Sequence, residues 1–446
     1  MPQVRTRIRR PAPVSESLQQ IGDRIRKARA EAGLSQAQLG APHFTRAYVS
    51  AIELGKVRPA MKSLEFMADK LGKPTSYFLE DAESERRRLE MTATVARSNQ
   101  LISEGKAADA IALLESLLKR AVTPSEKATL QRSLGRAYTQ EQRAPEAIAV
   151  LNDALRFFQA SDDPEQIART RSQLGAAMLE MRTYSEAQQE LEMALAFMSK
   201  TDVKDPLLKV HTLYNLGVSF YMRGDYQAAA QQFDRAAREG TDVGDLRWQA
   251  GLFAGMGMSY SRLHDFEAAV MYLRKSEALF EAINNKSRAV ESRLRAALSL
   301  RALGQRSKAD ELLTSALDEA RSTGSERLAV EISSYQAAHW AADGRDKEAI
   351  SVASDAVDAA GRLGDPLLKL IAQVNLAKAL KKTDRTRAEK VLREAAAGGR
   401  DAHGLGYAEI YSELSELLAE NGLAEEALNY SRKAYESERK KQGRTK

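Results

Sequence analysis

Residues 214–229 of this 446-residue chain read YNLGVSFYMRGDYQAA, and this stretch contains the pattern that decides the fold. A small residue, Gly217, stands inside a run of apolar and aromatic residues, and a second small residue, Ala229, follows further along. Between them lies the turn signal Gly224-Asp225. The stretch predicts two antiparallel helices that are joined by a tight turn and cross closely at the small residues, where a branched side chain would push them apart.

The same pattern recurs along most of the chain with a period of about 40 residues, which is typical of a solenoid. The first column of small residues consists of Ser98, Gly135, Gly175, Gly217, Gly257, Ala297, Ala337, Ala377 and Ser415. The second column consists of Ala110, Ala147, Ala187, Ala229, Ala269, Ala309, Ala349, Ala388 and Ala427. The two columns predict an all-α array of about nine helix pairs over residues 84–440, whose seventh to ninth units depart from the pattern.

The repeated unit resembles the tetratricopeptide repeat, and the resemblance covers about 350 residues. The period is longer than the usual value of about 34 residues, which implies longer helices or loops. The resemblance implies a right-handed α-solenoid whose inner surface is lined by the first helix of each pair.

Five short helices with tight breaks are predicted upstream of the array, in a domain that spans residues 18–80. They are expected over residues 18–32, 36–40, 45–54, 61–71 and 74–79. Ser35 and Gln38 form a capping-box pair at the start of the second helix, and Gly55 provides a stop after the third. Two short helices joined by a tight turn are the geometry of a helix-turn-helix DNA reader.

The segments GLSQAQL at 33–39 and YVSAIELGKVRP at 48–59 resemble the Xre group of phage-repressor-like DNA-binding domains. The turn between the second and third helices is about one residue shorter than in typical members and contains Pro42. The resemblance implies a double-stranded DNA operator as partner, with the third helix as the recognition helix.

The expected DNA contacts lie at the starts of the second and third helices and just beyond the third. They are Gln36, Thr45, Arg46, Ala47, Tyr48, Ser50, Lys56 and Arg58. Arg46 can make a paired contact to guanine, Ala47 can pack on a thymine methyl, and Gln36 can bond a phosphate or an adenine edge. Lys56 and Arg58 are expected to bind phosphates.

Other residues of the third helix are expected to form the core of this domain. Val49 and Ile52, together with Leu39 of the second helix, should hold the two helices at their angle. Tyr48 has an alternative position against the fourth helix instead of facing the DNA groove.

The formal charge of +6 is concentrated in the first part of the chain. Residues 1–83 contain 14 Lys and Arg against 9 Asp and Glu, whereas the remaining residues contain 53 against 52. Arg5, Arg7, Arg9 and Arg10 lie in the first ten positions. We therefore expect residues 1–17 to be a basic flexible arm beside a domain that meets a polyanion, although a merely soluble tail is the alternative.

The inner surface of the array is expected to bind an effector through residues at fixed offsets from the first column. The candidates are Arg136, Gln173, Tyr214, Asn215, Tyr221, Arg295, Arg301, Asn375 and Lys378, with His211 and Tyr335 at related offsets. Asparagine amides can bond both the N–H and the C=O of an extended peptide, and the cations can pair with carboxylates. Packing between neighbouring repeats is the alternative for each of them.

The composition argues against most enzyme classes, metal sites and cofactors. The chain has no cysteine, and its five histidines are not spaced as metal ligands. No Walker-type loop, secretory signal or membrane-spanning segment is recognisable. We expect a cytoplasmic protein with no cofactor, no metal, no membrane association and no enzymatic activity.

The combination of an Xre-type domain and a repeat array resembles the cytoplasmic peptide-pheromone receptors of bacteria. It implies a transcriptional regulator whose array binds a short signalling peptide that modulates DNA binding, as in quorum sensing. A homodimer is expected, because one head offers few contacts for specific binding. The alternative is a DNA-tethered scaffold whose array binds a folded partner protein.

Overall fold

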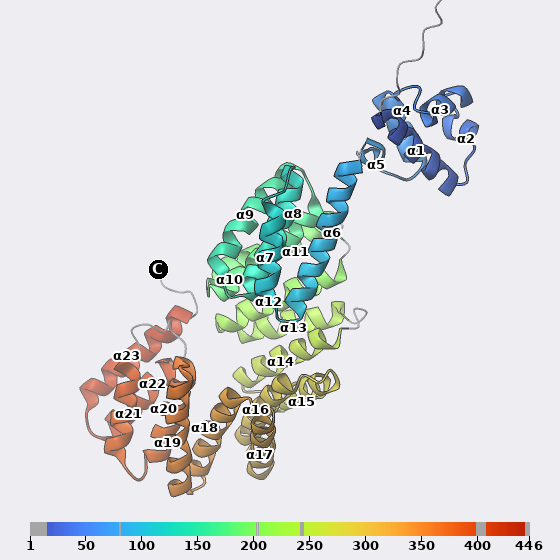
Figure 1. The fold of residues 1–446 in the computed structure, drawn as a ribbon. Helices are drawn as coiled ribbons and strands as arrows, with labels where there is room; N and C mark the ends of the chain where they lie inside the picture. The colour runs from blue at the N-terminus through green and yellow to red at the C-terminus, as the bar shows by residue number, and fades with distance from the viewer. Residues whose placement is uncertain are drawn as a thin grey trace, which may run out of the picture. The chain divides into compact units, whose positions relative to one another are not determined.

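The structure is a computed structural model that describes residues 16–79, 82–201, 203, 205–240, 245–397 and 407–441. Within these ranges all regular secondary structure is helical, which confirms the all-α prediction. The chain divides into two compact units, Met1–Gly105 and Lys106–Lys446 (Figure 1). Most of the predicted basic arm, residues 1–15, lies outside the described residues.

The first unit contains five short helices followed by one long helix. They are α1 (Glu16–Glu31), α2 (Gln36–Gly40), α3 (Arg46–Glu53), α4 (Met61–Lys70), α5 (Thr75–Leu79) and α6 (Ala82–Ser103). The Ser35 side chain accepts from the Gln38 backbone N–H, and the Gln38 side chain accepts from the Ser35 N–H, so the predicted capping box is present. Gly33 and Gly55 have positive φ, of 68° and 65°, after α1 and α3.

The core of α1–α5 is apolar and forces a close approach between α1 and α3. Leu39, Val49 and Ile52 are at most 1% exposed, so their predicted core positions are confirmed. A Cβ atom on Gly22 of α1 would lie only 2.4 Å from the Ile52 carbonyl oxygen. Glycine is therefore required where α1 meets the end of α3.

The second unit is an array of helix pairs, in which a first and a second helix alternate. The first helices are α8 (Pro124–Gln140), α10 (Pro164–Glu180), α12 (Pro206–Met222), α14 (Leu246–Arg262), α16 (Lys286–Ala302), α18 (Glu326–Ala342), α20 (Pro366–Leu380) and α22 (Tyr407–Glu420). The second helices are α7 (Ala107–Leu118), α9 (Ala144–Ala160), α11 (Tyr184–Thr201), α13 (Tyr226–Glu239), α15 (Phe266–Ala282), α17 (Arg306–Ser322), α19 (Asp346–Leu363), α21 (Arg385–Ala397) and α23 (Ala424–Lys441). The first predicted repeat is carried by α6 and α7, which fall in different units.

Local signals explain where the array helices begin and turn. Asp163, Asp205 and Asp365 cap helices whose first residue is proline, a pairing that satisfies free backbone N–H groups and presets φ. The turn from first to second helix has a positive-φ residue at the same register in most pairs. These residues are Gln142, Arg182, Gly224, His264, Gly304, Gly344 and Gly422.

The two columns of small residues lie at the helix crossings, as the sequence predicts. All nine alanines of the second column are at most 6% exposed. A Cβ atom on Gly135 would lie 2.3 Å from Leu151 Cγ of the partner helix, and one on Gly217 would lie 2.7 Å from Phe233 Cε1. These distances are too short for any side chain, so the small residues set the spacing of the pairs.

The first helices form the inner layer of the array. Within the described residues, consecutive first helices also meet one another directly, whereas consecutive second helices do not approach as closely. The layer with the closer spacing is the concave one, so the first helices line the inner side. The contact between α18 and α20 is the most extensive of these, and residues 372–377 of α20 are all buried. The array is therefore irregular at its seventh and eighth units.

Candidate nucleic-acid interface and inner face of the array

The start of α3 presents the residues that we expect to read DNA. Thr45 is the N-cap of α3, and its hydroxyl accepts from the Tyr48 backbone N–H at 3.3 Å. Arg46 and Ala47, in the first turn of the helix, are exposed. The first turn of a recognition helix is the part that reaches base edges in a major groove. Arg46 and Ala47 are therefore free to contact bases.

A buried carboxylate fixes the angle between α1, α2 and α3. Glu53 is 3% exposed and accepts from Arg29 Nε at 2.5 Å and from Gln36 Nε2 at 2.8 Å. Arg29 also donates to the Leu34 carbonyl oxygen at 2.7 Å, and its hydrogen bond with Glu53 raises its pKa. Gln36, an expected DNA contact, therefore also stabilises the helix-turn-helix geometry through its amide nitrogen.

The structure places Tyr48 against α4. Its hydroxyl lies 3.2 Å from Ser63 Oγ, and its ring packs 5.3 Å from that of Phe44. This is the alternative position that the sequence left open for Tyr48. Ser50, on the next turn of α3, is half-buried.

Two expected phosphate ligands follow α3 in an exposed segment. Lys56 and Arg58 are both exposed, and within the described residues neither side chain has a hydrogen-bond or ion-pair partner. The chain reaches them through Gly55, where a Cβ atom would lie 2.8 Å from the Gln19 side chain of α1. Exposed, unpaired cations beside a recognition helix suit contacts with the DNA backbone.

The inner face is defined here as the side of the first helices α8 to α22 that carries the expected effector residues. Arg136 of α8 is exposed to solvent, yet the surrounding protein desolvates it and lowers its pKa. The charge of Arg136 is therefore only partly shielded by water.

The expected cations on α16 and α20 are paired within the chain. Arg295 donates to Glu331 at 2.9 Å, and Arg301 donates to both carboxylate oxygens of Asp343 at 2.7 Å. Lys378 donates to Glu409 at 2.8 Å. Each of these pairs joins one first helix to the next repeat. The positive charges that α16 and α20 carry on the inner face are therefore neutralised by carboxylates of the protein itself.

The two expected asparagines differ in their surroundings. Asn375 is 3% exposed, and its amide nitrogen donates to Ser334 Oγ at 2.7 Å between α20 and α18. Asn215 of α12 is half-buried, and within the described residues no group bonds to its amide. Asn215 keeps its hydrogen-bonding capacity, whereas Asn375 uses its own for packing between repeats.

Unpaired polar atoms gather on α8, α10 and α12. Gln173 Oε1 and His211 Nε2 are buried without a hydrogen-bond partner. The His211 ring lies 3.8 Å from that of Trp248, and burial together with the charge of Arg136 lowers its pKa to about 4. Buried polar groups are rarely left unpaired in folded proteins, so these atoms are candidates for hydrogen bonds to a bound molecule.

Aromatic residues border this region. The ring of Tyr214 packs 5.3 Å from Trp248 and 5.7 Å from Phe233, and burial raises its pKa. Tyr221 is half-buried at the end of α12, with its ring 5.3 Å from that of Tyr226. They provide an apolar wall beside the unpaired amides.

Arg132 of α8 is not among the effector residues expected from the sequence. Its Nε atom is buried without a partner, and burial together with the charges of Arg169 and Arg136 lowers its pKa to about 10. Arg132 lies three residues before Gly135, at one of the offsets that define the expected effector residues. The offset pattern therefore contained the signal for Arg132, but the absence of a partner appears only in three dimensions.

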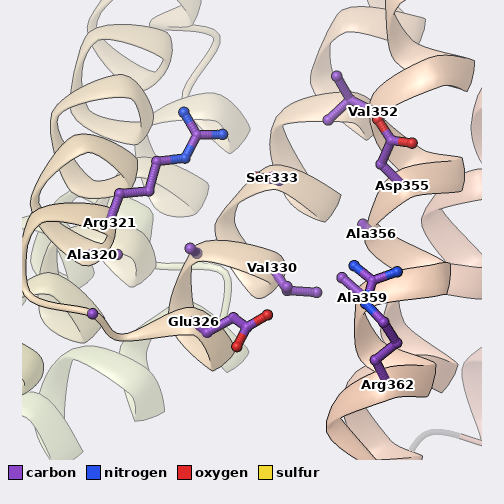
Figure 2. A pocket seen from close by; sticks show the side chains of 12 residues that line it. Ala320, Arg321, Glu326, Val330, Ser333, Val352, Asp355, Ala356, Ala359 and Arg362 are labelled. Carbon is purple, nitrogen blue, oxygen red and sulfur yellow. The ribbon is translucent and has the colours of Figure 1, made fainter.

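A separate pocket of about 580 Å³ lies between α17, α18 and α19 (Figure 2). Ala329 and Val330 of α18 and Ala356 of α19 give it an apolar lining, and Arg321 and Arg362 extend from the two flanking helices. None of the expected effector residues lines it.

No cluster of three or more potential metal-ligating side chains occurs among the described residues. In the same part of the chain, no helix has the length and apolarity needed to span a bilayer.

Comparison with known families agrees with this architecture. Residues 25–78 match the helix-turn-helix family, and residues 96–164 and 166–238 match two tetratricopeptide-repeat families. The protein therefore combines an Xre-type helix-turn-helix domain with a tetratricopeptide-repeat array. No curated protein matches the sequence.

Solved structures share the fold at low sequence identity. The apo form of the quorum sensor NprR from B. thuringiensis is 13% identical, with 78% of this chain and 98% of that chain covered and a TM-score of 0.56. A Rap protein complexed with Competence and Sporulation Factor is 12% identical, with 80% and 99% covered and a TM-score of 0.55. Aspartyl phosphate phosphatase F from Bacillus subtilis is 12% identical, with 78% and 93% covered and a TM-score of 0.53.

Proposed function

We propose that this protein is a sequence-specific transcriptional regulator whose repeat array binds a short signalling peptide that modulates DNA binding. The observation that carries the proposal is the pairing of two sites in one chain. One is a recognition helix with Arg46 and Ala47 exposed in its first turn. The other is an inner face with unpaired amides at Gln173 and Asn215.

The fold comparison supports the same function. NprR is described as a quorum sensor, and the Rap protein was solved with a signalling factor bound. Their arrays share the fold of this one, so an array of this kind is compatible with recognition of a signal. By analogy we assign the inner face of this protein to effector binding.

Within the inner face, we assign peptide contact to Arg136, Gln173, Tyr214, Asn215 and Tyr221. An extended peptide offers one N–H and one C=O per residue, which the amides of Gln173 and Asn215 can bond. We assign Arg295, Arg301, Asn375 and Lys378 to holding the repeats together, because each already has a partner in the neighbouring repeat.

The array is proposed to act by binding and not by catalysis. Aspartyl phosphate phosphatase F has a similar fold, but a fold shared at 12% identity does not transfer a reaction. We also propose that two copies act together in the cytoplasm, because operators read by helix-turn-helix domains consist of two half-sites about one helical turn apart.

Selection of duplexes from a random DNA library by the full-length protein tests DNA reading. Arg46→Ala should weaken binding to the selected operator by about 1–3 kcal/mol and relax one base position, because the bidentate contact to guanine is lost. Arg26→Ala, which removes an exposed arginine from α1, is the matched control and should keep the preference. Equal losses on operator and random DNA would show that Arg46 does not read bases.

A further inference from the structure

Three polar side chains on consecutive first helices lie within about one helical turn of one another along the inner face. Counted from the first residues of their helices, Arg132 of α8, Gln173 of α10 and His211 of α12 stand eight, nine and five residues along. Ser172 Oγ of α10 and Thr212 Oγ1 of α12 are hydrogen-bonded at 2.8 Å, and Gln173 and His211 directly adjoin this pair in sequence.

Each of these side chains has a buried polar atom without a partner. The atoms are Arg132 Nε, Gln173 Oε1 and His211 Nε2. Arg136, one helical turn beyond Arg132, contributes a further positive charge that is felt at both Arg132 and His211. The three orphan atoms and Arg136 thus share one electrostatic environment.

The charge of Arg132 is only partly countered by the protein, through the carboxylates of Glu165 and Asp163. Arg169, the neighbouring arginine, is paired with Glu165 at 2.8 Å and Asp205 at 2.6 Å, whereas no carboxylate of the described residues lies within ion-pair distance of Arg132. Burying a cation without a partner costs free energy, and the depressed pKa of Arg132 reflects that cost. A buried arginine without an ion-pair partner does not stabilise the fold, so we expect Arg132 to serve binding.

We propose that Arg132, Arg136, Gln173 and His211 form a carboxylate-binding subsite that anchors one acidic group of the effector. A guanidinium presents two parallel N–H donors to a carboxylate, and beside partly buried groups such as Arg132 and His211 that bond is stronger than in water. The Gln173 amide can turn its nitrogen toward the ligand, because its oxygen and nitrogen exchange places on a simple flip. The carboxylate is the carboxyl terminus of a peptide or an aspartate or glutamate side chain.

The subsite adds detail to the proposed function. It depends on that function only for the identity of the molecule that carries the carboxylate. It also predicts a direction for stability. Arg132→Gln removes an unbalanced charge, so its melting temperature should equal or exceed that of the parent. A residue that serves the fold alone would lower it.

The test uses the full-length chain with Trp340→Phe, which leaves Trp248, beside His211, as the remaining tryptophan of the sequence. Three pools of random heptapeptides serve as probes in affinity selection read by mass spectrometry. The first has free carboxyl termini and no Asp or Glu, the second is amidated and contains Asp and Glu, and the third is amidated and contains neither. Glutarate, a dicarboxylate without peptide bonds, is titrated separately against Trp248 fluorescence.

We expect the first or the second pool to be retained about tenfold better than the third, and the retained pool identifies the source of the carboxylate. Glutarate should change Trp248 fluorescence saturably. Arg132→Gln should remove both responses. Arg171→Gln, which loses the same charge from α10 at a site paired with Glu190, should keep them. If Arg132→Gln does not fold, Arg136→Gln replaces it in the same comparison.

The subsite stands if either probe gives a carboxylate response that depends on these arginines, and it falls if neither does. Equal retention of all three pools without a glutarate response would overturn the subsite and leave peptide binding intact. Retention of no pool would contradict the proposed peptide function, and the glutarate titration would then decide the subsite alone.

Discussion

On the inner face, some polar side chains have hydrogen-bond or ion-pair partners within the protein, and others have buried polar atoms without a partner. Asn375 and Lys378 bond to residues of neighbouring repeats, while Gln173, Arg132 and His211 hold buried atoms without partners. Native proteins leave such groups unpaired chiefly where function requires them, and the rest of the fold must compensate for the lost stability. The location of the unpaired atoms is therefore better evidence for a site than residue type alone.

His211 should make the stability of the array depend on pH. Its pKa is about 4 in the folded protein and near 6.5 when unfolded, because burial and the charge of Arg136 disfavour the protonated ring. The part of the free energy of unfolding that depends on a neutral His211 is fully present above pH 6.5. It is lost as the pH falls toward 4, because His211 is protonated at a higher pH in the unfolded chain than in the folded protein. The loss should amount to about 2–3 kcal/mol.

The measurement is urea unfolding of the parent and His211→Asn between pH 7 and pH 4. The variant should lose less stability over this interval, and the difference between the two curves isolates His211 from the carboxylates that titrate in the same range. His339→Asn is a useful comparison, because burial and Arg301 lower the pKa of His339 as well. Parallel curves for parent and His211→Asn would contradict the assignment.

At the scale of helices and turns, the sequence predicted most of the fold because its signals act locally. Ser35 caps α2, Gly33 and Gly55 follow α1 and α3 in positive φ, and the alanine column is buried throughout. Each of these features depends on residues that are close in sequence or on a fixed repeat. Pairings such as Asn375 with Ser334 link residues of different repeats and depend on how far one repeat rotates on the next, which the sequence pattern does not contain.

Helix crossings in the array should not tolerate one added methyl group. A Cβ atom on Gly175 would lie 2.5 Å from Leu191 Cγ, so Gly175→Ala should destabilise the array by about 1–3 kcal/mol despite the higher helix propensity of alanine. On Gly251 of α14, the nearest contact would be 3.6 Å from Tyr214 Cε2, an ordinary distance.

Gly251→Ala is therefore the matched control, and it should leave stability unchanged or raise it by up to about 1 kcal/mol. Chemical denaturation followed by circular dichroism at 222 nm measures both variants. Similar effects of the two substitutions would mean that glycine at the crossing is not needed for close packing.

At the scale of the whole molecule, the proposed DNA-reading helix α3 and the inner face belong to different compact units. A regulator of this kind works only if the effector binds one state of the protein better than another. The coupling is a free energy shared by both sites, so it must appear in both binding measurements.

Reciprocal titrations test this coupling directly. If a peptide selected by the array changes operator affinity by a given factor, operator DNA should change peptide affinity by the same factor, typically about 5- to 150-fold. Isothermal titration of the full-length protein with each ligand, in the presence and absence of the other, measures the two factors. If neither ligand changes the affinity of the protein for the other, the protein would instead be a DNA-tethered scaffold.

The continuous burial of residues 372–377 in α20 has a consequence for how this protein can change in evolution. Repeat arrays commonly gain or lose whole units, because each unit contacts only its neighbours. Here α20 is enclosed by α18, α19, α21 and α22, and residues 372–377 are matched to those surroundings. Duplication or deletion of a unit should be tolerated among α8–α15, whereas the segment from α18 to α22 should be inherited as one block of fixed length.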